Sequence, residues 1–311
     1  MNELTTRDLI RHAECLIVAN PVAAAVTPAV VAAIEERLAR CVRKVRTVWT
    51  DGPRTPGELL GDAEIIVTVG GDGTVADLLP ALAPWHVLCA LPAGSGNSTA
   101  RNLYGDRTWS QVLDLLEDPD SLTLRRLDLL HLVEPDALAL LGASTGFLAD
   151  VLIKARDVAP SVTGLDRYHA AAPRVLQDMP RHPTRVTVDG VVLAEGPMSS
   201  VAVGGGRFRA RSFQFLPRSV LDDGLIDVSA IDALDERVLG DVLALLPSGD
   251  HLSRPEVSYG RGRQVIIERT DGSPLMAEFD GSVWDAAGSR LTVDVVPGTL
   301  SVLTSSTGAL T

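Results

Sequence analysis

The sequence predicts an α/β domain with a doubly wound parallel sheet, followed by a second, β-rich domain built as an antiparallel sandwich. Over residues 1–122, short and continuously apolar runs alternate with segments of helical periodicity. This pattern is typical of parallel strands that are covered by helices on both faces. After Pro119, strand-like segments follow one another, and several are joined by Asp-Gly pairs, which favour hairpin turns.

The elements of the first domain follow in a regular order. The run 15–19 predicts a buried strand that stops at the turn signal Asn20-Pro21. Pro28 then stands at the first turn of a helix, where its missing amide is tolerated. The same patterns predict strands at 45–49, 64–69 and 87–91 and helices at 28–41, 57–62, 75–82 and 109–117.

The second domain is expected to span residues 123–290, with the last segment, 291–311, packing back on the first domain. Its predicted hairpin turns are Asp189-Gly190, Asp271-Gly272 and Asp280-Gly281. The predicted strands are 123–132, 136–142, 185–193, 198–204, 224–231, 263–268, 274–280 and 290–303, and helices are expected near 147–157, 164–178 and 235–246.

Composition excludes several classes of protein. The 311 residues carry a net charge of −12, which argues against a binder of nucleic-acid backbones and against steady attachment to anionic lipid. The three cysteines, Cys15, Cys41 and Cys89, are widely spaced and predict neither a disulfide framework nor a zinc site. The N-terminus lacks a signal-peptide pattern and no apolar run is long enough to span a membrane, so we expect a cytoplasmic protein with peripheral membrane contact at most.

The strongest motif is Gly70-Gly71-Asp72-Gly73-Thr74, between a buried strand and a helix. Ligands bind at this edge of open parallel sheets, and glycines let the backbone approach a phosphate. Asp72 can bind magnesium, orient an acceptor or take its proton, and Thr74 can cap the helix or contact a phosphate. From spacing alone, an ordinary strand-to-helix turn with a capping side chain fits equally well.

A second glycine-rich loop, Pro92-Ala93-Gly94-Ser95-Gly96-Asn97, also follows a strand. Two such loops at one sheet edge can face a single anionic ligand. Neither is followed by the Gly-Lys-Ser/Thr of a Walker A motif, and neither matches the dinucleotide fingerprint in the expected first unit.

Together these motifs resemble a known superfamily. The sequence Gly70–Thr74 is the signature shared by diacylglycerol, sphingosine, ceramide and NAD kinases, and the second loop is similar to that of the lipid-kinase branch, particularly its sphingosine-kinase form. Further similar segments follow in the right order over nearly the whole chain: Asn20-Pro21, Thr50, Leu127-Asp128-Leu129, the 146–151 segment and the 222–228 turn.

The resemblance implies an ATP-dependent kinase that transfers the γ-phosphate to a hydroxyl of a lipid or lipid-like alcohol of the diacylglycerol or sphingoid-base type. Domain 1–122 then binds the nucleotide, domain 123–290 the acceptor, and the active site lies in the cleft between them. Asp72 is the implied catalytic residue and Asp128 lies near the acceptor. The implied nucleotide contacts are Asn20, Thr50, Gly70, Gly71, Gly73, Thr74, Gly94, Ser95, Gly96 and Asn97.

The resemblance also implies two roles for magnesium. One ion accompanies ATP. A structural ion, as in bacterial members of the family, is held by Asp223 with the backbone of Val220 and Leu225. Members of the family often form homodimers, so the resemblance allows a homodimer here.

One departure from the family concerns the base. The family's Asp-Gly-Glu is Asp280-Gly281-Ser282 here, and a serine cannot replace a carboxylate base. Asp72 can take the role, or Glu278 can do so from the same strand face. Alternatively, the chain is a non-catalytic, nucleotide-binding relative.

A second departure is an arginine cluster, Arg207, Arg209 and Arg211, at a position where the family often has three glycines. These side chains form either a solvated strand face paired to local acids or a substrate-binding pocket for an anion. The pocket would suit nucleotide phosphates or a polar acceptor, so a kinase of a polar small molecule stays an alternative.

The segment Gly142-Ala143-Ser144-Thr145-Gly146 fits a hydrolase pattern, with Ser144, Asp223 and His251 in the required chain order. The kinase signatures on either side make this a minor alternative.

Overall fold

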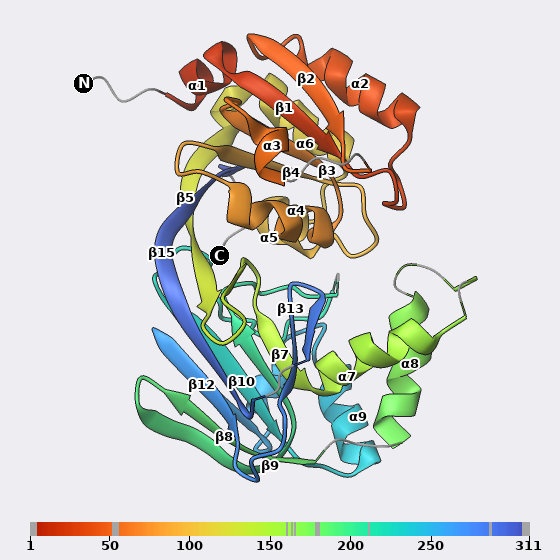
Figure 1. The fold of residues 1–311 in the computed structure, drawn as a ribbon, viewed down its shortest axis with the longest axis vertical. Helices are drawn as coiled ribbons and strands as arrows, with labels where there is room; N and C mark the ends of the chain where they lie inside the picture. The colour runs from red at the N-terminus through yellow and green to blue at the C-terminus, as the bar shows by residue number, and fades with distance from the viewer. Residues whose placement is uncertain are drawn as a thin grey trace. The chain divides into compact units, whose positions relative to one another are not determined.

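The computed structural model describes residues 5–51, 56–159, 161–162, 164, 166–177, 181–210, 212–285 and 288–306. It divides into two compact units (Figure 1), one made of Met1–Leu127 with Gly298–Thr311 and the other of Asp128–Pro297. The chain passes from one unit to the other inside β5 (Leu122–Leu132) and again inside β15 (Arg290–Ser305). Both boundaries lie further along the chain than the expected boundaries at 122 and 290. The sequence pattern marks where each strand begins, whereas each of these two strands contributes residues to both units.

The first unit has the predicted parallel α/β architecture. Its sheet has the order β2-β1-β3-β4-β15, and each neighbouring pair is parallel. The strands β1, β3 and β4 are almost completely buried, as their unbroken apolar sequences predict. Their bounds are β1 (Glu14–Ala19), β2 (Lys44–Trp49), β3 (Ile65–Gly70) and β4 (Val87–Pro92).

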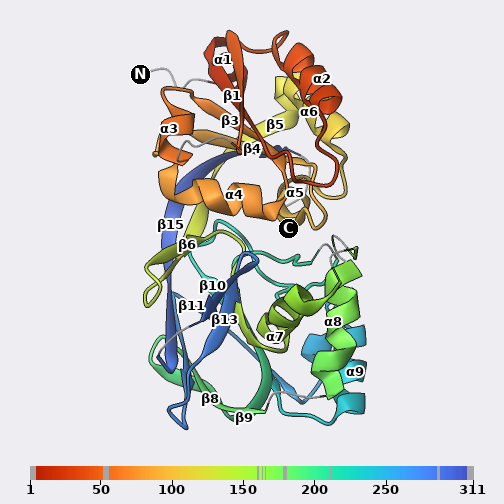
Figure 2. The ribbon, with the colours of Figure 1, turned by 45° about the vertical axis from the view of Figure 1, so that its right-hand side comes forward.

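Helices cover both faces of this sheet (Figure 2), with α2 against α6 and α3 against α4. Helix α2 begins as predicted, with Pro28 in the first turn and Thr27 accepting a hydrogen bond from the amide of Val30. The helices are α1 (Thr6–His12), α2 (Pro28–Leu38), α3 (Pro56–Leu60), α4 (Asp72–Leu78), α5 (Ser98–Tyr104) and α6 (Trp109–Glu117). Helix α4 begins earlier than residue 75, because Asp72, Gly73 and Thr74 form its first turn.

The second unit is rich in antiparallel strands, as predicted. Its strands follow the order β14-β13-β7-β9-β8-β12-β15, with β10 paired to β9 and β11, and β6 paired to β5. They are β6 (Ala137–Ala139), β7 (Ala143–Gly146), β8 (His182–Val188), β9 (Val191–Gly204), β10 (Ile226–Asp232), β11 (Val257–Gly262), β12 (Gln264–Arg269), β13 (Met276–Phe279) and β14 (Ser282–Asp285). The helices are α7 (Phe147–Lys154), α8 (Asp166–Gln177) and α9 (Glu236–Ala244).

Two of the three predicted hairpin turns are confirmed. Asp189-Gly190 has φ angles of 48° and 81° and joins β8 to β9, and Asp280-Gly281 has 45° and 87° and joins β13 to β14. The segment 185–193, predicted as one strand, is therefore divided between β8 and β9. Asp271-Gly272 follows β12, which does not pair with β13, so the prediction of a hairpin there is wrong.

A buried apolar cluster fills the second unit, with side chains from most of its strands, including Leu130, Val186, Val203, Val228, Ile267 and Val293. No helix in the described part of the chain has the length and apolar character needed to cross a membrane.

Candidate active site

The two glycine-rich loops contact each other through their backbones. A Cβ atom added to Gly94 would lie 2.3 Å from the Cα and 2.8 Å from the nitrogen of Gly71, and one added to Gly71 would lie 3.2 Å from the Cα of Gly94. Because β3 and β4 are parallel neighbours, their carboxyl ends bring the two loops to the same edge of the sheet. The predicted pairing of the loops is thus present, and glycine at positions 71 and 94 allows it.

Asp72 connects the two loops. Its Oδ2 accepts a hydrogen bond from the amide of Ser98 (3.0 Å) and its Oδ1 accepts one from the amide of Thr99 (2.7 Å). A Cβ atom on Gly96 would lie 2.9 Å from Asp72 Oδ2, so this glycine makes room for the carboxylate. The first residue of α4 therefore caps the start of α5, and each carboxylate oxygen retains accepting capacity.

Asn97 fixes the second loop. It has a left-handed backbone (φ 53°), its Oδ1 accepts a hydrogen bond from the amide of Gly94, and its Nδ2 donates one to the carbonyl of Gly94, both at 2.8 Å. Asparagine tolerates this conformation better than most residues. The Asn97 side chain therefore shapes the loop.

Asn20 and Thr74 support the first loop in the same way. Asn20 Nδ2 donates a hydrogen bond to Thr74 Oγ1 (3.0 Å), and Thr74 is buried. A Cβ atom on Gly70 would lie 2.3 Å from this hydroxyl oxygen. Of the alternatives left open by the sequence for Thr74, the buried position favours a structural role for its side chain.

Gly73 is the exception among the glycines of these loops. It is exposed, and a Cβ atom built on it would meet nothing within 4 Å. Glycine inside a helix costs about 0.5–1 kcal/mol relative to alanine, and no contact in the described part of the protein requires it here. Close approach of a ligand to the backbone would explain it.

The remaining predicted nucleotide contacts lie close to these loops in the chain. Ser95 is half-buried within the second loop, and Thr50 is exposed at the end of β2, where its amide donates to the carbonyl of Ala19 (3.0 Å). Neither side chain has a role in the loop geometry described above.

Glu278 and Arg209 form a buried ion pair in the second unit. Glu278 Oε1 accepts hydrogen bonds from Arg209 Nη2 and from the hydroxyl of Ser144, and Oε2 accepts one from the amide of Gly281 (3.2 Å). The side chains of Arg209 and Glu278 are only 9% and 4% exposed. Both carboxylate oxygens are thus occupied by donors within the unit.

This ion pair changes two of the sequence predictions. Glu278 is a poor candidate for the base, because its carboxylate is buried and its oxygens already accept three hydrogen bonds. Arg209 is a poor candidate for an anion pocket, because Glu278 neutralises its charge. Arg207 is half-buried and stays a prediction, and Arg211 lies outside the described residues.

Asp128 is the first residue of the second unit. The residue is buried, its Oδ2 accepts a hydrogen bond from the amide of Gly224, and its own amide donates to the carbonyl of Leu221, both at 2.7 Å. Asp128 therefore holds β5 against the turn that precedes β10.

The predicted structural magnesium site contains an arginine instead. Asp223 Oδ1 accepts a hydrogen bond from the amide of Leu225 (3.1 Å), while its other oxygen pairs with Arg261. Arg261 Nε also lies 3.0 Å from Asp227 Oδ1, which accepts a second hydrogen bond from the hydroxyl of Tyr259 (2.7 Å). Burial raises the pKa of Asp227, although Tyr259 and Arg261 act in the opposite direction.

A divalent cation at Asp223 would be repelled by this guanidinium, so the residues present do not fit the ion expected from Asp223, Val220 and Leu225. In addition, the described residues contain no group of three or more acidic, histidine or cysteine side chains that could hold a metal. Arg261 comes from β11, a strand that the sequence did not predict.

Removing Arg261 tests whether this arginine, and not a magnesium ion, is the partner of Asp223. We expect Arg261→Met to lower the free energy of unfolding by about 1–3 kcal/mol, because two neighbouring carboxylates lose their charged donor. Millimolar Mg²⁺ without nucleotide should then raise the melting temperature of the variant and leave that of the wild type unchanged. The matched control is Arg254→Met, which removes a partly exposed pair with Glu256. A rise in the melting temperature of the wild type would contradict the assignment.

The hydrolase alternative is not supported by the geometry. Ser144 donates its hydroxyl to Glu278, Asp223 pairs with Arg261, and His251 Nε2 lies 3.3 Å from the carbonyl oxygen of Phe215. The three side chains needed for a triad thus each have another partner.

A parallel α/β unit with two glycine loops in contact, followed by a β-rich unit, is the architecture that the resemblance to kinases implies, and comparisons with known proteins agree. Residues 14–130 match the family model described as "Diacylglycerol kinase catalytic domain", and residues 143–304 match "YegS C-terminal NAD kinase beta sandwich-like domain". The chain belongs to this family of diacylglycerol kinase-like and YegS-like kinases.

Individual relatives support the same family. A "Probable lipid kinase YegS-like" from Xanthomonas oryzae pv. oryzae is 27% identical over 254 residues, covering 76% of this chain and 79% of the relative. A crystal structure of a diacylglycerol kinase from Bacillus anthracis covers 96% of this chain and 98% of its own at 16% identity, with a TM-score of 0.70. An NAD kinase from Archaeoglobus fulgidus in complex with ATP covers 94% and 92% at 15% identity, with a TM-score of 0.51. These two structures establish the fold.

Proposed function

We propose that this protein transfers the γ-phosphate of ATP to a hydroxyl group of a lipid or lipid-like alcohol, of the diacylglycerol or sphingoid-base type. The observation that carries the proposal is the pair of interlocked glycine loops with Gly73 open at their surface. The probable lipid kinase among the relatives supports the acceptor class, and the ATP complex among the structural neighbours supports the donor.

In this proposal the loop backbone around Gly71, Gly73 and Gly94 receives the nucleotide phosphates. Magnesium bound with ATP would neutralise the developing phosphate charge. Asp72 fits such an ion, because Mg²⁺ is usually held by one or two carboxylates together with substrate phosphates, without a dedicated protein cage.

The acceptor hydroxyl requires orientation more than a strong base, because phosphoryl transfer has a loose transition state. Asp72 is our candidate to orient the hydroxyl and receive its proton, since Glu278 is occupied by Arg209. Asp128 would help to position the acceptor molecule. The serine at position 282 favours one alternative, a nucleotide-binding relative without turnover.

The alternative of a kinase that acts on a polar small molecule loses part of its support, because Arg209 pairs with Glu278 and does not contribute to an anion pocket. We further propose a cytoplasmic protein that meets a lipid acceptor only at the membrane surface. A homodimer is compatible with this proposal.

A pair of alanine substitutions tests whether phosphate binds at the loops. Gly73 and Gly57 both occupy the second position of a short helix, and added Cβ atoms meet nothing within 4 Å at either one. We expect both alanine variants to be as stable as the wild type or more stable by up to about 1 kcal/mol. Only Gly73→Ala should weaken ATP binding, by about tenfold or more, the equivalent of roughly 1.4 kcal/mol.

Calorimetric titration with Mg-ATP would measure the two affinities, and transfer of label from γ-labelled ATP to diacylglycerol, sphingosine, ceramide, NAD and polyols would identify the acceptor. Unchanged ATP affinity in Gly73→Ala would show that the phosphates lie elsewhere. ATP binding without label on any acceptor would favour the non-catalytic alternative.

A further inference from the structure

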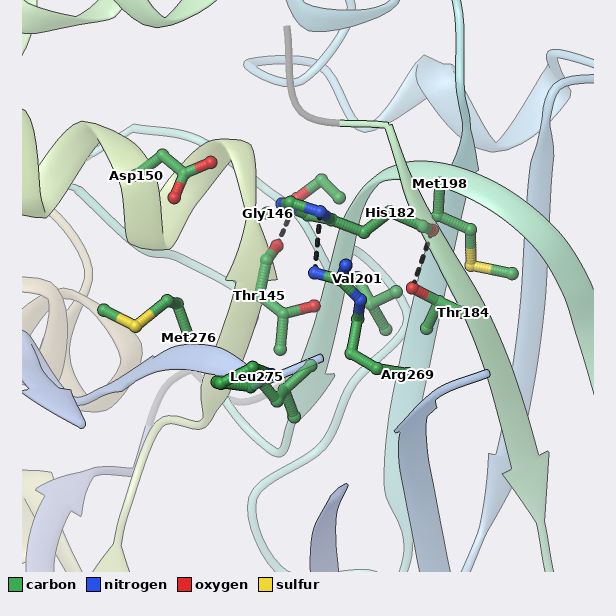
Figure 3. Close-up of a pocket in the computed structure, with 12 residues that line it drawn as sticks. Thr145, Gly146, Asp150, His182, Thr184, Met198, Val201, Arg269, Leu275 and Met276 are labelled. Carbon is green, nitrogen blue, oxygen red and sulfur yellow. Dashed lines mark hydrogen bonds between the residues drawn. The ribbon is translucent and has the colours of Figure 1, made fainter. Parts of the chain in front are cut away.

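A cavity of about 290 Å³ lies within the second unit (Figure 3), at the small end of the range for ligand-binding pockets. Its walls come from β7, α7, β8, β9, β12 and the start of β13. The kinase proposal assigns no role to this cavity.

The cavity combines an apolar wall with a few polar side chains. Met198, Val201 and Leu275 belong to the buried apolar cluster of the unit, and Met276 lies beside them. Figure 3 shows Asp150 projecting from α7 toward the side of the cavity where His182 lies. A ligand with an apolar part and one polar group would match this lining.

Asp150 is the half-buried acid of the cavity lining. Within the described part of the chain, its carboxylate has no hydrogen bond and no close ion pair. Burial raises its pKa to about 6, with Lys154 and Arg269 acting in the opposite direction. At neutral pH the group is therefore mostly ionised and lacks a cationic partner at hydrogen-bonding distance.

The other ionisable groups of the cavity carry no net positive charge. Arg269 is neutralised by Asp271, with Nη2–Oδ2 and Nε–Oδ1 distances of 2.8 and 3.2 Å. Arg269 Nη1 lies 2.7 Å from His182 Nδ1. Because a guanidinium can only donate, Nδ1 must accept, so the ring proton lies on Nε2. Burial lowers the pKa of His182, Arg269 lowers it further, and the ring is neutral at pH 7.

We propose that this cavity binds a small organic cation, a protonated primary amine on a short apolar chain, with its ammonium group on the carboxylate of Asp150. The ammonium group supplies the charge and the donors that Asp150 lacks, and the alkyl chain lies against Leu275, Val201 and the two methionines. The proposal does not depend on the phosphoryl-transfer reaction.

Lys154 and Arg174 do not oppose this binding from inside the cavity. They line a separate hollow of about 90 Å³ that Asp150 also borders. Asp150 is therefore the acid that faces the larger cavity, beside the neutral Arg269–Asp271 pair, while Lys154 acts on it from the other hollow.

Three probes with five carbons each test the proposal on the full-length protein: n-pentylamine, 1-pentanol and pentanoate. We expect pentylamine to bind with a millimolar dissociation constant in calorimetry. Pentanol should bind at least about tenfold more weakly, because it lacks the charge-assisted hydrogen bond, and pentanoate should not bind. Equal affinity for amine and alcohol, or preferential binding of pentanoate, would overturn the proposal.

Asp150→Asn should reduce the affinity for pentylamine to that for pentanol. Its melting temperature at pH 7 should equal or exceed that of the wild type, because a desolvated charge is removed. Asp157→Asn, an exposed acid in the turn after α7, is the matched control and should bind pentylamine as the wild type does. Unchanged amine binding in Asp150→Asn would refute the assignment.

A pH series on the wild-type protein gives a second readout that needs no variant. Pentylamine stays protonated between pH 5 and 8, so its binding should weaken as the pH falls through about 6 and Asp150 becomes neutral. The groups near Asp150 that could contribute are Lys154 on α7, Arg174 on α8, His182 on β8 and Arg269 on β12. The cationic side chains keep their charge in this range, and protonation of His182 would act in the same direction. Amine binding independent of pH over this range would contradict the proposal.

Discussion

Asp72→Asn is expected to lower the rate of phosphoryl transfer by roughly 100-fold to 10,000-fold, the usual contribution of a catalytic acid or base. The side chain keeps its shape but loses the negative charge that would hold magnesium and the acceptor proton. The proposed reaction therefore depends on this residue more than on any other in the first unit.

The same substitution has a structural cost that must be separated from the catalytic one. Asp72 accepts hydrogen bonds from the amides of Ser98 and Thr99, and an asparagine side chain can accept only one of them with its oxygen. We expect the free energy of unfolding to fall by about 1–3 kcal/mol, which leaves the variant folded in most conditions.

Parallel measurement of turnover and of urea unfolding distinguishes the two effects. Asp77→Asn is the matched control, since Asp77 is exposed on the same helix, and it should leave both quantities near those of the wild type. If Asp72→Asn kept the full turnover of the wild type, the site assignment would be wrong.

Arg209→Met is expected to lower the free energy of unfolding by about 3–5 kcal/mol, because Glu278 would stay buried without a positive partner. Adding Glu278→Gln should restore most of the loss, since the neutral side chain no longer needs a cation. The exposed pair Arg185–Glu195 gives the control, and Arg185→Met should cost at most about 1 kcal/mol.

Urea unfolding with similar m-values for all variants would measure these differences. The double variant is the decisive sample, because it separates an ion pair from simple loss of packing. Should Arg209→Met leave stability unchanged and raise only the KM for a substrate, Arg209 would be a binding residue after all.

The glycine loops could be predicted from sequence because both the motif and its context are local. Gly70–Thr74 and Pro92–Asn97 each follow a continuously apolar strand, and parallel neighbours bring such loops together. Their hydrogen bonds were not predictable to the same degree. The capping of α5 by Asp72 depends on backbone geometry across two loops, which no spacing reveals.

The interactions of the second unit were harder to predict because they join distant segments. Glu278 meets Arg209 across a long stretch of sequence, and Arg261 reaches Asp223 from β11. The sequence of β11, Val257–Gly262, contains two glycines and an arginine and lacks a clear apolar alternation. Without that strand, Asp223 appeared available to a metal ion. Asp150 was part of a recognised motif, but only the cavity shows that its carboxylate lacks a partner.

The two long strands that belong to both units also determine how the gene can be divided. The edge of β4 is covered by residues near Ser301 and Val302, which are encoded after the whole second unit. A fragment that ends with the first 127 residues would therefore lack one of its own strands and expose an apolar sheet edge, a common cause of aggregation. Natural or engineered exchange of the second unit must consequently be made as an insertion between β5 and β15, not as a fusion of two consecutive halves.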